Sequence, residues 1–256
     1  SNQIAMRVRA CLFDDQPGSY FYPEYQPQVD VSTGRIVGFE ALLRWHDAMY
    51  GTTPVWKVIE LVESLDMIST LDFIVVRKVC ADIAEWQAAG TAVPKVSVNL
   101  SRTTLQTEGL ADKLVSLLRE YDIEPSALTL EITEGTLLRD LDQARRRMLA
   151  LRGLGIEISL DDFGTGYSSM YSLQHLPIQE LKIDRSFVSG SHRSEKDAAL
   201  VEAMLLVARR LQLRVVAEGV ELSEQALQLT QWNPDIVLQE RWLVEVLGEP
   251  DAAAKI

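Results

Sequence analysis

The chain of 256 residues is 47% hydrophobic, enough to bury one sizeable core, so it suits a single large barrel as well as two small domains. Its formal net charge of −12 disfavours binding to polymeric nucleic acid, because a sequence-independent hold on phosphates needs a basic surface. Cys11 and Cys80 form no CxxC pair and favour a reduced protein over a disulfide-stabilised one.

The N-terminal residues come before any strand pattern and begin with SNQIAM, without an initiator methionine. We expect residues 1–20 to be an N-terminal extension, a linker or cloning remnant on a piece of a longer protein, and residues 21–256 to be one barrel domain. No signal peptide is visible. The most apolar long stretch, residues 71–86, contains Arg77, Lys78 and Asp82, so we expect a soluble helix and no membrane contact by this domain. A cytoplasmic location follows, alone or as the cytosolic part of a membrane-anchored protein.

Short strand-like runs alternate with longer helical runs, the pattern of an α/β protein with a mostly parallel sheet. The expected strands are Glu24–Val31, Arg35–Leu43, Lys95–Leu100, Ala127–Thr133, Ile156–Asp161, Glu180–Asp184, Arg214–Glu218 and Asp235–Gln239. The first two are joined by the tight turn STGR, which contains Gly34 and predicts an antiparallel hairpin. The sequence therefore predicts a modified TIM (β/α)8 barrel whose first strand is antiparallel to the rest.

Between the later strands lie segments of helical period. The expected helices are Val55–Leu65, Ser69–Ala89, Leu110–Tyr121, Leu141–Leu154, Glu195–Leu211 and Ser223–Gln231. Their apolar residues recur at spacings of three and four, as in Leu200, Met204 and Val207, which fits helices packed around a barrel.

Polar residues at the expected strand ends are the candidates for function, because active sites of such barrels lie at the C-terminal ends of the strands. They are Glu40, Asn99, Glu131, Asp161, Asp162, Lys182, Glu218 and Gln239. A single charged residue at a strand end usually just contacts solvent. Seven strand ends that converge on one axis favour a common site instead.

The carboxylates in this set would repel one another unless a cation compensates them or some are protonated. Oxygen ligands without histidine suit Mg²⁺ or Mn²⁺ better than zinc, since His46, His175 and His192 lie elsewhere in the sequence. The adjacent Asp161 and Asp162 could serve two ions about 3.5–4 Å apart, the arrangement used for phosphoryl displacement.

These residues stand in long motifs that resemble the EAL-domain family of cyclic di-GMP phosphodiesterases, named for the tripeptide that appears here as Glu40-Ala41-Leu42. The motifs YQPQVDVSTGRIVGFEALLRW, VSVNLS, LEITE, SLDDFGTGYSSM, LPIQELKIDRSFV and VVAEGVE occur in family order between residues 22 and 239. Several long motifs in order are far more specific than one short match.

The resemblance implies hydrolysis of cyclic di-GMP to linear pGpG with Mg²⁺ or Mn²⁺, and the paired aspartates favour two ions. The implied metal ligands are Glu40, Asn99, Glu131, Asp161, Asp162 and Glu218, and the implied catalytic residues are Lys182, Glu218 and Glu40. The implied substrate contacts are Gln26, Arg44, Asp184 and Gln239. Asp184 also lies two residues after Lys182 on an extended strand, on the same side, and could orient it.

The segment FGTGYSS resembles the family's mobile loop, with Gly164 and Gly166 providing backbone freedom and Ser168 and Ser169 available to hydrogen-bond. The resemblance makes Glu134 the anchor of this loop and places Glu221 near the site. Each has a simpler alternative: Glu134 could only begin a helix near Gly135, and Glu221 could be a solvated or structural residue. Arg44, similarly, could be a surface salt-bridge partner.

The chain departs from the family pattern after the eighth strand, where Glu240 and Arg241 follow Gln239 in place of Gly-Tyr. NPDIVLQ fits the usual Cys-Asp-x-x-Gln poorly, and VWKVIELVESLDMI keeps Glu63 but loses Phe-Ile-Pro. These changes leave the implied metal ligands intact and affect the expected floor of the substrate pocket.

Two other functions remain open at this point. Some EAL-like domains bind cyclic di-GMP without hydrolysing it, or serve only as interaction platforms, although such domains typically lose metal ligands. A lysine on the sixth strand of a barrel could instead form a Schiff base, which requires a deprotonated amine, whereas carboxylates around Lys182 should keep it charged. Family members often act as dimers, so we also expect a homodimer, by analogy alone.

Overall fold

The computed structural model describes residues 2–13, 18–137, 140–165, 170–233 and 235–239. The strands are β1 Ser19–Asp30, β2 Arg35–Asp47, β3 Gly51–Thr52, β4 Lys95–Asn99, β5 Leu128–Thr133, β6 Glu157–Phe163, β7 Glu180–Ile183, β8 Arg214–Glu218 and β9 Val237–Gln239. The α-helices are α1 Asn2–Cys11, α2 Val55–Ser64, α3 Ile68–Ala88, α4 Arg102–Leu105, α5 Leu110–Glu120, α6 Leu141–Gly153, α7 Met170–His175, α8 Arg185–Val188, α9 Glu195–Arg210 and α10 Ser223–Trp232. Short 3-10 helices are η1 Pro125–Ala127 and η2 Glu134–Leu137.

Eight of these strands close into a barrel, with β3 as a short addition beside β2. The sheet order is β1-β9-β8-β7-β6-β5-β4-β2-β3, and an additional pairing of β1 with β2 completes the circle. Strand β1 runs antiparallel to both β2 and β9. The other neighbouring pairs of the barrel are parallel: β2–β4, β4–β5, β5–β6, β6–β7, β7–β8 and β8–β9. The predicted barrel with one reversed strand is confirmed.

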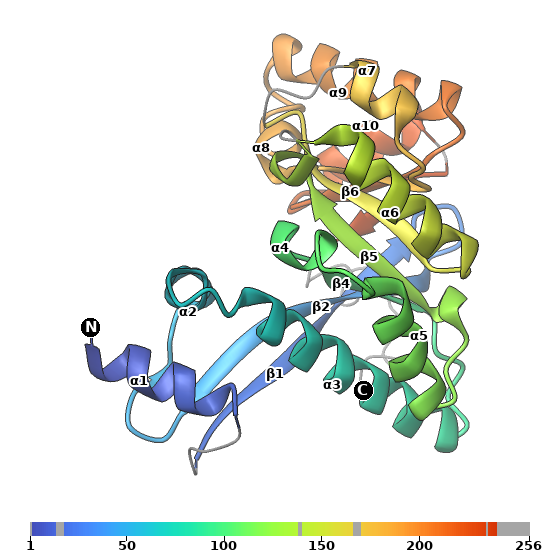
Figure 1. Ribbon diagram of the computed structural model, residues 1–256. Helices are drawn as coiled ribbons and strands as arrows, with labels where there is room; N and C mark the ends of the chain where they lie inside the picture. The colour runs from blue at the N-terminus through green and yellow to red at the C-terminus, as the bar shows by residue number, and fades with distance from the viewer. Residues whose placement is uncertain (1, 14–17, 138–139, 166–169, 234, 240–256) are drawn as a thin grey trace.

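The helices lie outside this barrel, as their apolar periodicity predicted (Figure 1). Apolar residues on strands and helices form one continuous core, in which Leu114, Met148 and Val201 are buried on three different helices. The six expected helices correspond to α2, α3, α5, α6, α9 and α10. The sequence did not predict the short helices α4, α7 and α8, because a helix of four to six residues has too few turns to show a period.

The hairpin is longer than predicted, since β1 begins at Ser19 and β2 ends at Asp47. Its outer end projects from the barrel and packs with α1 and α2, an assembly that we call the N-terminal lobe (Figure 1). Phe21, Trp45 and Val8 of α1 are almost fully buried there. Burial of these apolar side chains explains why the strands continue beyond the barrel.

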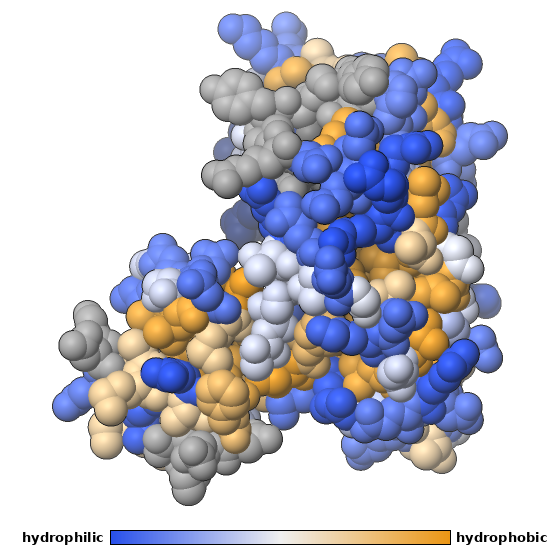
Figure 2. All heavy atoms as spheres, in the orientation of Figure 1, coloured by the Kyte–Doolittle hydropathy of each residue, from blue (hydrophilic) through white to orange (hydrophobic). Residues whose placement is uncertain are grey.

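The N-terminal lobe includes residues that we assigned to an extension. Arg7 Nε of α1 donates to Asp47 Oδ2 over 2.6 Å, so this helix is fixed to the hairpin by charge as well as by apolar contact. The lobe also exposes Met6, Met49 and Trp56, and apolar surface is visible on it in Figure 2. The division into an extension and a barrel domain at residue 20 stays a prediction. Among the described residues no helix has the length and apolar character needed to span a membrane.

Candidate active site

Strand closure brings the polar strand-end residues to one end of the barrel interior. Their positions are Glu40 on β2, Asn99 on β4, Glu131 on β5, Asp161 and Asp162 on β6, Lys182 on β7, Glu218 on β8 and Gln239 on β9. Strand pairing sets Asn99 level with Glu131, and Glu218 level with Gln239. The parallel strands therefore deliver these side chains together, as carboxyl ends of parallel strands must.

Lys182 lies at the centre of the site and is fully buried. Its Nζ is 2.8 Å from Glu40 Oε2, 2.8 Å from Glu131 Oε2 and 2.7 Å from Glu218 Oε1. Asp161 Oδ1 is 3.6 Å away. One ammonium thus contacts carboxylates from four other strands, an arrangement that holds the ends of the barrel strands in fixed relative positions.

Two adjacent carboxylates reach the same site because β6 is irregular at its end. Successive side chains of a strand normally point to opposite faces. The register between β6 and β7 shifts between Leu160 and Phe163, and Asp162 has a φ of 56°. This bulge turns the chain so that ligand atoms of Asp161, Asp162 and Glu218 lie within 4.8 Å of one another. A left-handed conformation is tolerated better by aspartate than by most residues.

The charges of the site perturb one another. Burial alone would lower the pKa of Lys182, but the carboxylates of Glu131, Glu40 and their neighbours outweigh it and hold this pKa well above its ordinary value. Lys182 is therefore protonated at neutral pH. A Schiff-base lysine must lose its proton, so this environment argues against the Schiff-base alternative.

The carboxylates divide into two groups by the direction of their pKa shifts. Burial raises the pKa of Glu218 to about 7 and that of Asp162 to about 6, and it holds the pKa of Glu131 well above its usual range. Burial also acts on Glu40, but the charge of Lys182 and hydrogen bonds to that carboxylate prevail and lower its pKa. The site has more negative charge than its single ammonium balances.

Glu40 is held by a set of donors from three strands. It accepts from Lys182 Nζ, from Asn99 Nδ2 at 2.9 Å and from Gln239 Nε2. Gln239 Nε2 also donates to Gln26 Oε1 at 3.2 Å, so Gln26 and Gln239 both lie at the site. Gln239 is buried on β9, and its assignment to the substrate stays a prediction. Glu240 and Arg241 lie outside the described residues.

Glu134 follows β5 and is almost fully buried, and its Oε2 accepts from the backbone N of Gly164 at 3.2 Å. This contact places Glu134 at the start of the segment FGTGYSS, where we expected an anchor. Gly164 has a φ of 96°, and a Cβ there would lie 2.6 Å from Met204 Cε, so only glycine fits. Gly166, Ser168 and Ser169 lie outside the described residues.

Three expected site residues form their hydrogen bonds or ion pairs outside the carboxylate cluster, although the charge of Asp184 lies near enough to help raise the pKa of Asp162. Arg44 Nε donates to Glu24 Oε2 at 2.8 Å, and Glu221 pairs with Arg185 near the surface. Asp184 caps helix α8 by accepting from Ser186 N at 3.0 Å. The ion pairs of Lys182 in the described part of the chain do not include Asp184, so the suggested orienting contact is not formed. Their roles toward a substrate stay predictions.

The same residues fit divalent metal ions. Oε1 of Glu131 is buried and has no hydrogen-bond partner among the described residues. The ligand atoms of Asp161, Asp162 and Glu218 already converge, and all donors in the set are oxygen or amide groups. A hard cation such as Mg²⁺ would satisfy the unpaired oxygen and offset the excess negative charge.

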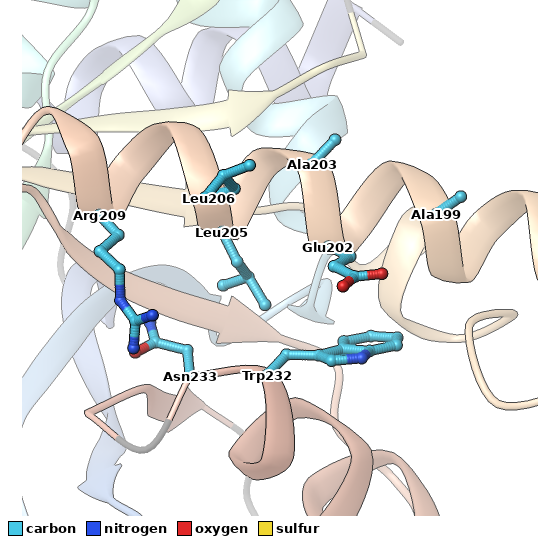
Figure 3. Close-up of a pocket in the computed structure, with 8 residues that line it drawn as sticks. All are labelled: Ala199, Glu202, Ala203, Leu205, Leu206, Arg209, Trp232 and Asn233. Carbon is cyan, nitrogen blue, oxygen red and sulfur yellow. The ribbon is translucent and has the colours of Figure 1, made fainter.

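A different hollow, of about 380 Å³, lies between α9 and α10 on the outside of the barrel (Figure 3). Leu205, Leu206 and Trp232 line it, together with Glu202 and Arg209. Glu202 is the one carboxylate among its described lining residues, and its walls are helix faces instead of strand ends. The barrel centre is therefore the candidate active site.

A family model described as EAL domain matches residues 15–238, which include every strand of the barrel but the last residue of β9. The chain belongs to the EAL domain family. This EAL domain is 39% identical over 207 residues to the bifunctional diguanylate cyclase/cyclic di-GMP phosphodiesterase MucR of Pseudomonas aeruginosa, covering 81% of this chain and 30% of MucR. It is 35% identical over 235 residues to the cyclic di-GMP phosphodiesterase NbdA of the same organism, covering 92% of this chain and 30% of NbdA.

Among solved structures, the EAL domain resembles a cyclic di-GMP complex of the PaMucR phosphodiesterase, with a TM-score of 0.86 and 35% identity. That likeness covers 99% of this chain and 100% of the other. The oxygen sensor protein DosP of Escherichia coli is 38% identical over 201 residues, 78% of this chain and 25% of DosP. The chain thus spans between a quarter and about a third of the length of the curated relatives named here.

Sequence reasoning overlooked one side chain in this EAL domain. Gln28 is buried on β1 and its Nε2 donates to Gln239 Oε1 at 2.9 Å. The available signal was its spacing from Gln26, because residues two apart on a strand share a face.

Proposed function

We propose that this EAL domain hydrolyses one phosphodiester bond of cyclic di-GMP and releases linear pGpG. The observation that carries the proposal is the buried Lys182 ammonium among carboxylates of four other strands, beside the adjacent Asp161 and Asp162. The similarity to the cyclic di-GMP phosphodiesterase NbdA and to the cyclic di-GMP complex of the PaMucR phosphodiesterase supports cyclic di-GMP as the substrate class.

The reaction depends on divalent metal, two ions of Mg²⁺ or Mn²⁺ in this proposal. The residues that would hold them are Glu40, Asn99, Glu131, Asp161, Asp162 and Glu218. Bound there, the metal would lower the pKa of a water molecule and neutralise phosphate charge. This also explains how a protein of net charge −12 attracts an anionic substrate.

Lys182 supplies a fixed positive charge and hydrogen-bond donors at Nζ, since its pKa is raised. It orients the attacking water and stabilises negative charge that develops in the transition state. Glu40 and Glu218 hold the ammonium by accepting from it at 2.8 and 2.7 Å. We assign Gln26, Arg44, Asp184 and Gln239 to the substrate, and Glu134 and Glu221 to support of the loop that follows β6.

The test is incubation with cyclic di-GMP and Mg²⁺, with chromatographic separation of pGpG, in parallel with a sample containing excess chelator. Product that appears with Mg²⁺ and is absent with chelator supports the proposal. Ca²⁺ should not replace Mg²⁺, because it prefers longer bonds and looser coordination. Tight binding of cyclic di-GMP without product would instead identify a receptor. If the protein neither bound nor hydrolysed cyclic di-GMP, the interaction-platform alternative would be favoured.

We further propose a homodimer in the cytoplasm, with no contact to polymeric nucleic acid. Light scattering coupled to gel filtration measures the oligomeric state, since a dimer has twice the 28.7 kDa mass of the chain. A monomer at all concentrations tested would contradict it.

A further inference from the structure

Gln28 belongs to the reversed strand β1, and its side chain lies inside the barrel between β2 and β9. It is 5% exposed, and strand pairing sets it level with Gly38 on β2 and with Gln239 on β9. Strand β1 pairs with both of these strands and closes the barrel between them.

The hydrogen bonds around Gln239 have a fixed direction. Glu40 is a carboxylate that accepts only, so the side chain of Gln239 must present its Nε2 to Glu40 Oε2, as it does. The carbonyl oxygen of the same amide then points to the opposite side and needs a donor. Gln28 Nε2 supplies it at 2.9 Å.

If that donor were missing, the buried oxygen of the Gln239 amide would lose its hydrogen-bond partner, and only the Nε2 side of the amide would be held, by Glu40 and Gln26. Rotation by half a turn would not repair this, because it would place two acceptors against each other at Glu40. Gln28 therefore holds the Gln239 amide in position against Glu40.

The backbone beside Gln28 is shaped to admit it. A Cβ built on Gly38 would lie 2.5 Å from Gln28 Oε1 and 3.3 Å from the carbonyl oxygen of Lys95. The glycine thus leaves room for the Gln28 amide, and any larger residue there would displace it.

We propose that Gln28 is a positioning residue for the reaction, acting through Gln239 to fix the carboxylate of Glu40. Its effect on turnover rests on the proposed phosphodiesterase function, whereas its effect on metal affinity and on the Gln239 amide does not. Partners that orient the ligands of a metal commonly change metal affinity or activity by about 10–100-fold when removed.

The first experiment compares Gln28→Met with the unmodified chain and with Gln179→Met. Methionine keeps the length of the side chain but neither donates nor accepts as an amide does. Gln179 is a suitable control because it accepts from Ile158 N and donates to Pro177 O, away from the carboxylates. We expect Gln28→Met to lower kcat about 10-fold and Mn²⁺ affinity by a similar factor, with KM changed less than about twofold, while Gln179→Met changes none of them.

The second experiment asks whether Gln28 acts through Gln239. Adding Gln28→Met to Gln239→Met should lower kcat and Mn²⁺ affinity less than about twofold further, because the amide that Gln28 holds is already gone. If Gln28 had only a structural role, the two substitutions would act independently and their effects would multiply. Gly38→Ala provides a second route to the same loss with Gln28 present, and it should reproduce the lowered Mn²⁺ affinity.

A nuclear magnetic resonance measurement reads the amide itself in metal-free protein. The side-chain amide signals of Gln239, assigned by their loss in Gln239→Met, should shift in Gln28→Met and exchange faster with water. Unchanged signals and unchanged Mn²⁺ affinity in folded Gln28→Met would overturn the inference. If the unmodified chain produced no pGpG, the proposed function would fail, while calorimetric Mn²⁺ binding and the amide signals would still decide the role of Gln28.

Discussion

The two ends of the barrel hold charged side chains in different proportions. At the C-terminal ends of the strands, five carboxylates surround the single ammonium of Lys182; they are Glu40, Glu131, Asp161, Asp162 and Glu218. At the N-terminal ends, Lys95 and Arg214 pair with Glu157 and Glu180, two cations with two carboxylates.

The pKa shifts reflect that difference. At the N-terminal end, burial tends to raise the pKa of Glu157, but Arg214 and Lys95 outweigh it and lower that pKa. At the C-terminal end, the pKa values of Glu218 and Asp162 rise to about 7 and about 6. A balanced cluster stabilises the fold by itself, whereas an unbalanced one stores repulsion that a bound cation relieves.

The largest effect should come from Asp161→Asn, which removes one charge from the unbalanced end. We expect hydrolysis to fall by about 10³-fold or more, because a ligand of the proposed metal is lost. The melting temperature of the chelator-treated protein should hold steady or rise, since repulsion decreases. Substantial turnover in this variant would contradict the metal assignment.

Lys182→Met removes the only ammonium at that end among the residues that the structure describes. We expect kcat to fall about 10²–10³-fold, the scale of losing one preorganised charge-stabilising donor, while cyclic di-GMP still binds. The free energy of unfolding in chelator should fall by about 3–5 kcal/mol, because removal of one partner leaves buried carboxylates uncompensated. Mg²⁺ should restore part of this loss. A variant with unchanged kcat would remove Lys182 from the catalytic residues.

The affinity for metal should depend on pH. Protons and metal compete for Glu218 and Asp162, whose pKa values lie near 7 and 6, so the Mn²⁺ affinity should increase about tenfold between pH 6 and pH 8. Calorimetry in buffers of different ionisation enthalpy measures the protons released. A flat affinity over this range would show that neither carboxyl group takes up a proton.

The same shifts set the pH dependence of metal-free stability. The folded pKa values of Glu218 and Asp162 exceed their ordinary values of 4.5 and 3.8. At pH values between the ordinary and the folded pKa, the folded state therefore binds more protons than the unfolded state. The contribution of these two carboxyl groups to the free energy of unfolding is therefore lost as the pH rises from about 4 through about 7. The lowered pKa of Glu157 works in the opposite direction, and its contribution is lost as pH falls through the folded pKa.

The smallest effect should come from Arg214→Gln at the balanced end. Arg214 Nη2 lies 3.3 Å from Glu180 Oε2 and also pairs with Glu157, but its side chain is 44% exposed. Solvent screening reduces the loss in the free energy of unfolding to about 1–2 kcal/mol. Denaturant titration should detect this change while kcat stays within about twofold. A large loss of turnover would mean that the two ends are coupled.

The sequence predicted the barrel because alternating strand and helix patterns are local. A window of ten to fifteen residues contains the period of each element, and the turn at Gly34 revealed the reversed hairpin. It also supplied the chemistry of the site, since Lys182 and Glu218 are polar residues at the ends of apolar strands. The N-terminal lobe was not predicted, because α1 becomes interpretable only when Val8 is buried against Phe21 and Trp45 of the hairpin.

Sequence by itself determined which residue types stand at each strand end, and thereby the excess of carboxylates in this EAL domain. Only the tertiary structure decided that Asp161 and Asp162 both enter the site, because the bulge at a φ of 56° depends on pairing with β7. Closure of the barrel likewise brought Gln28 to Gln239, 211 residues away along the chain. Strand periodicity is a property of neighbouring residues, whereas register and closure arise from pairing between distant strands, and no local pattern encodes them.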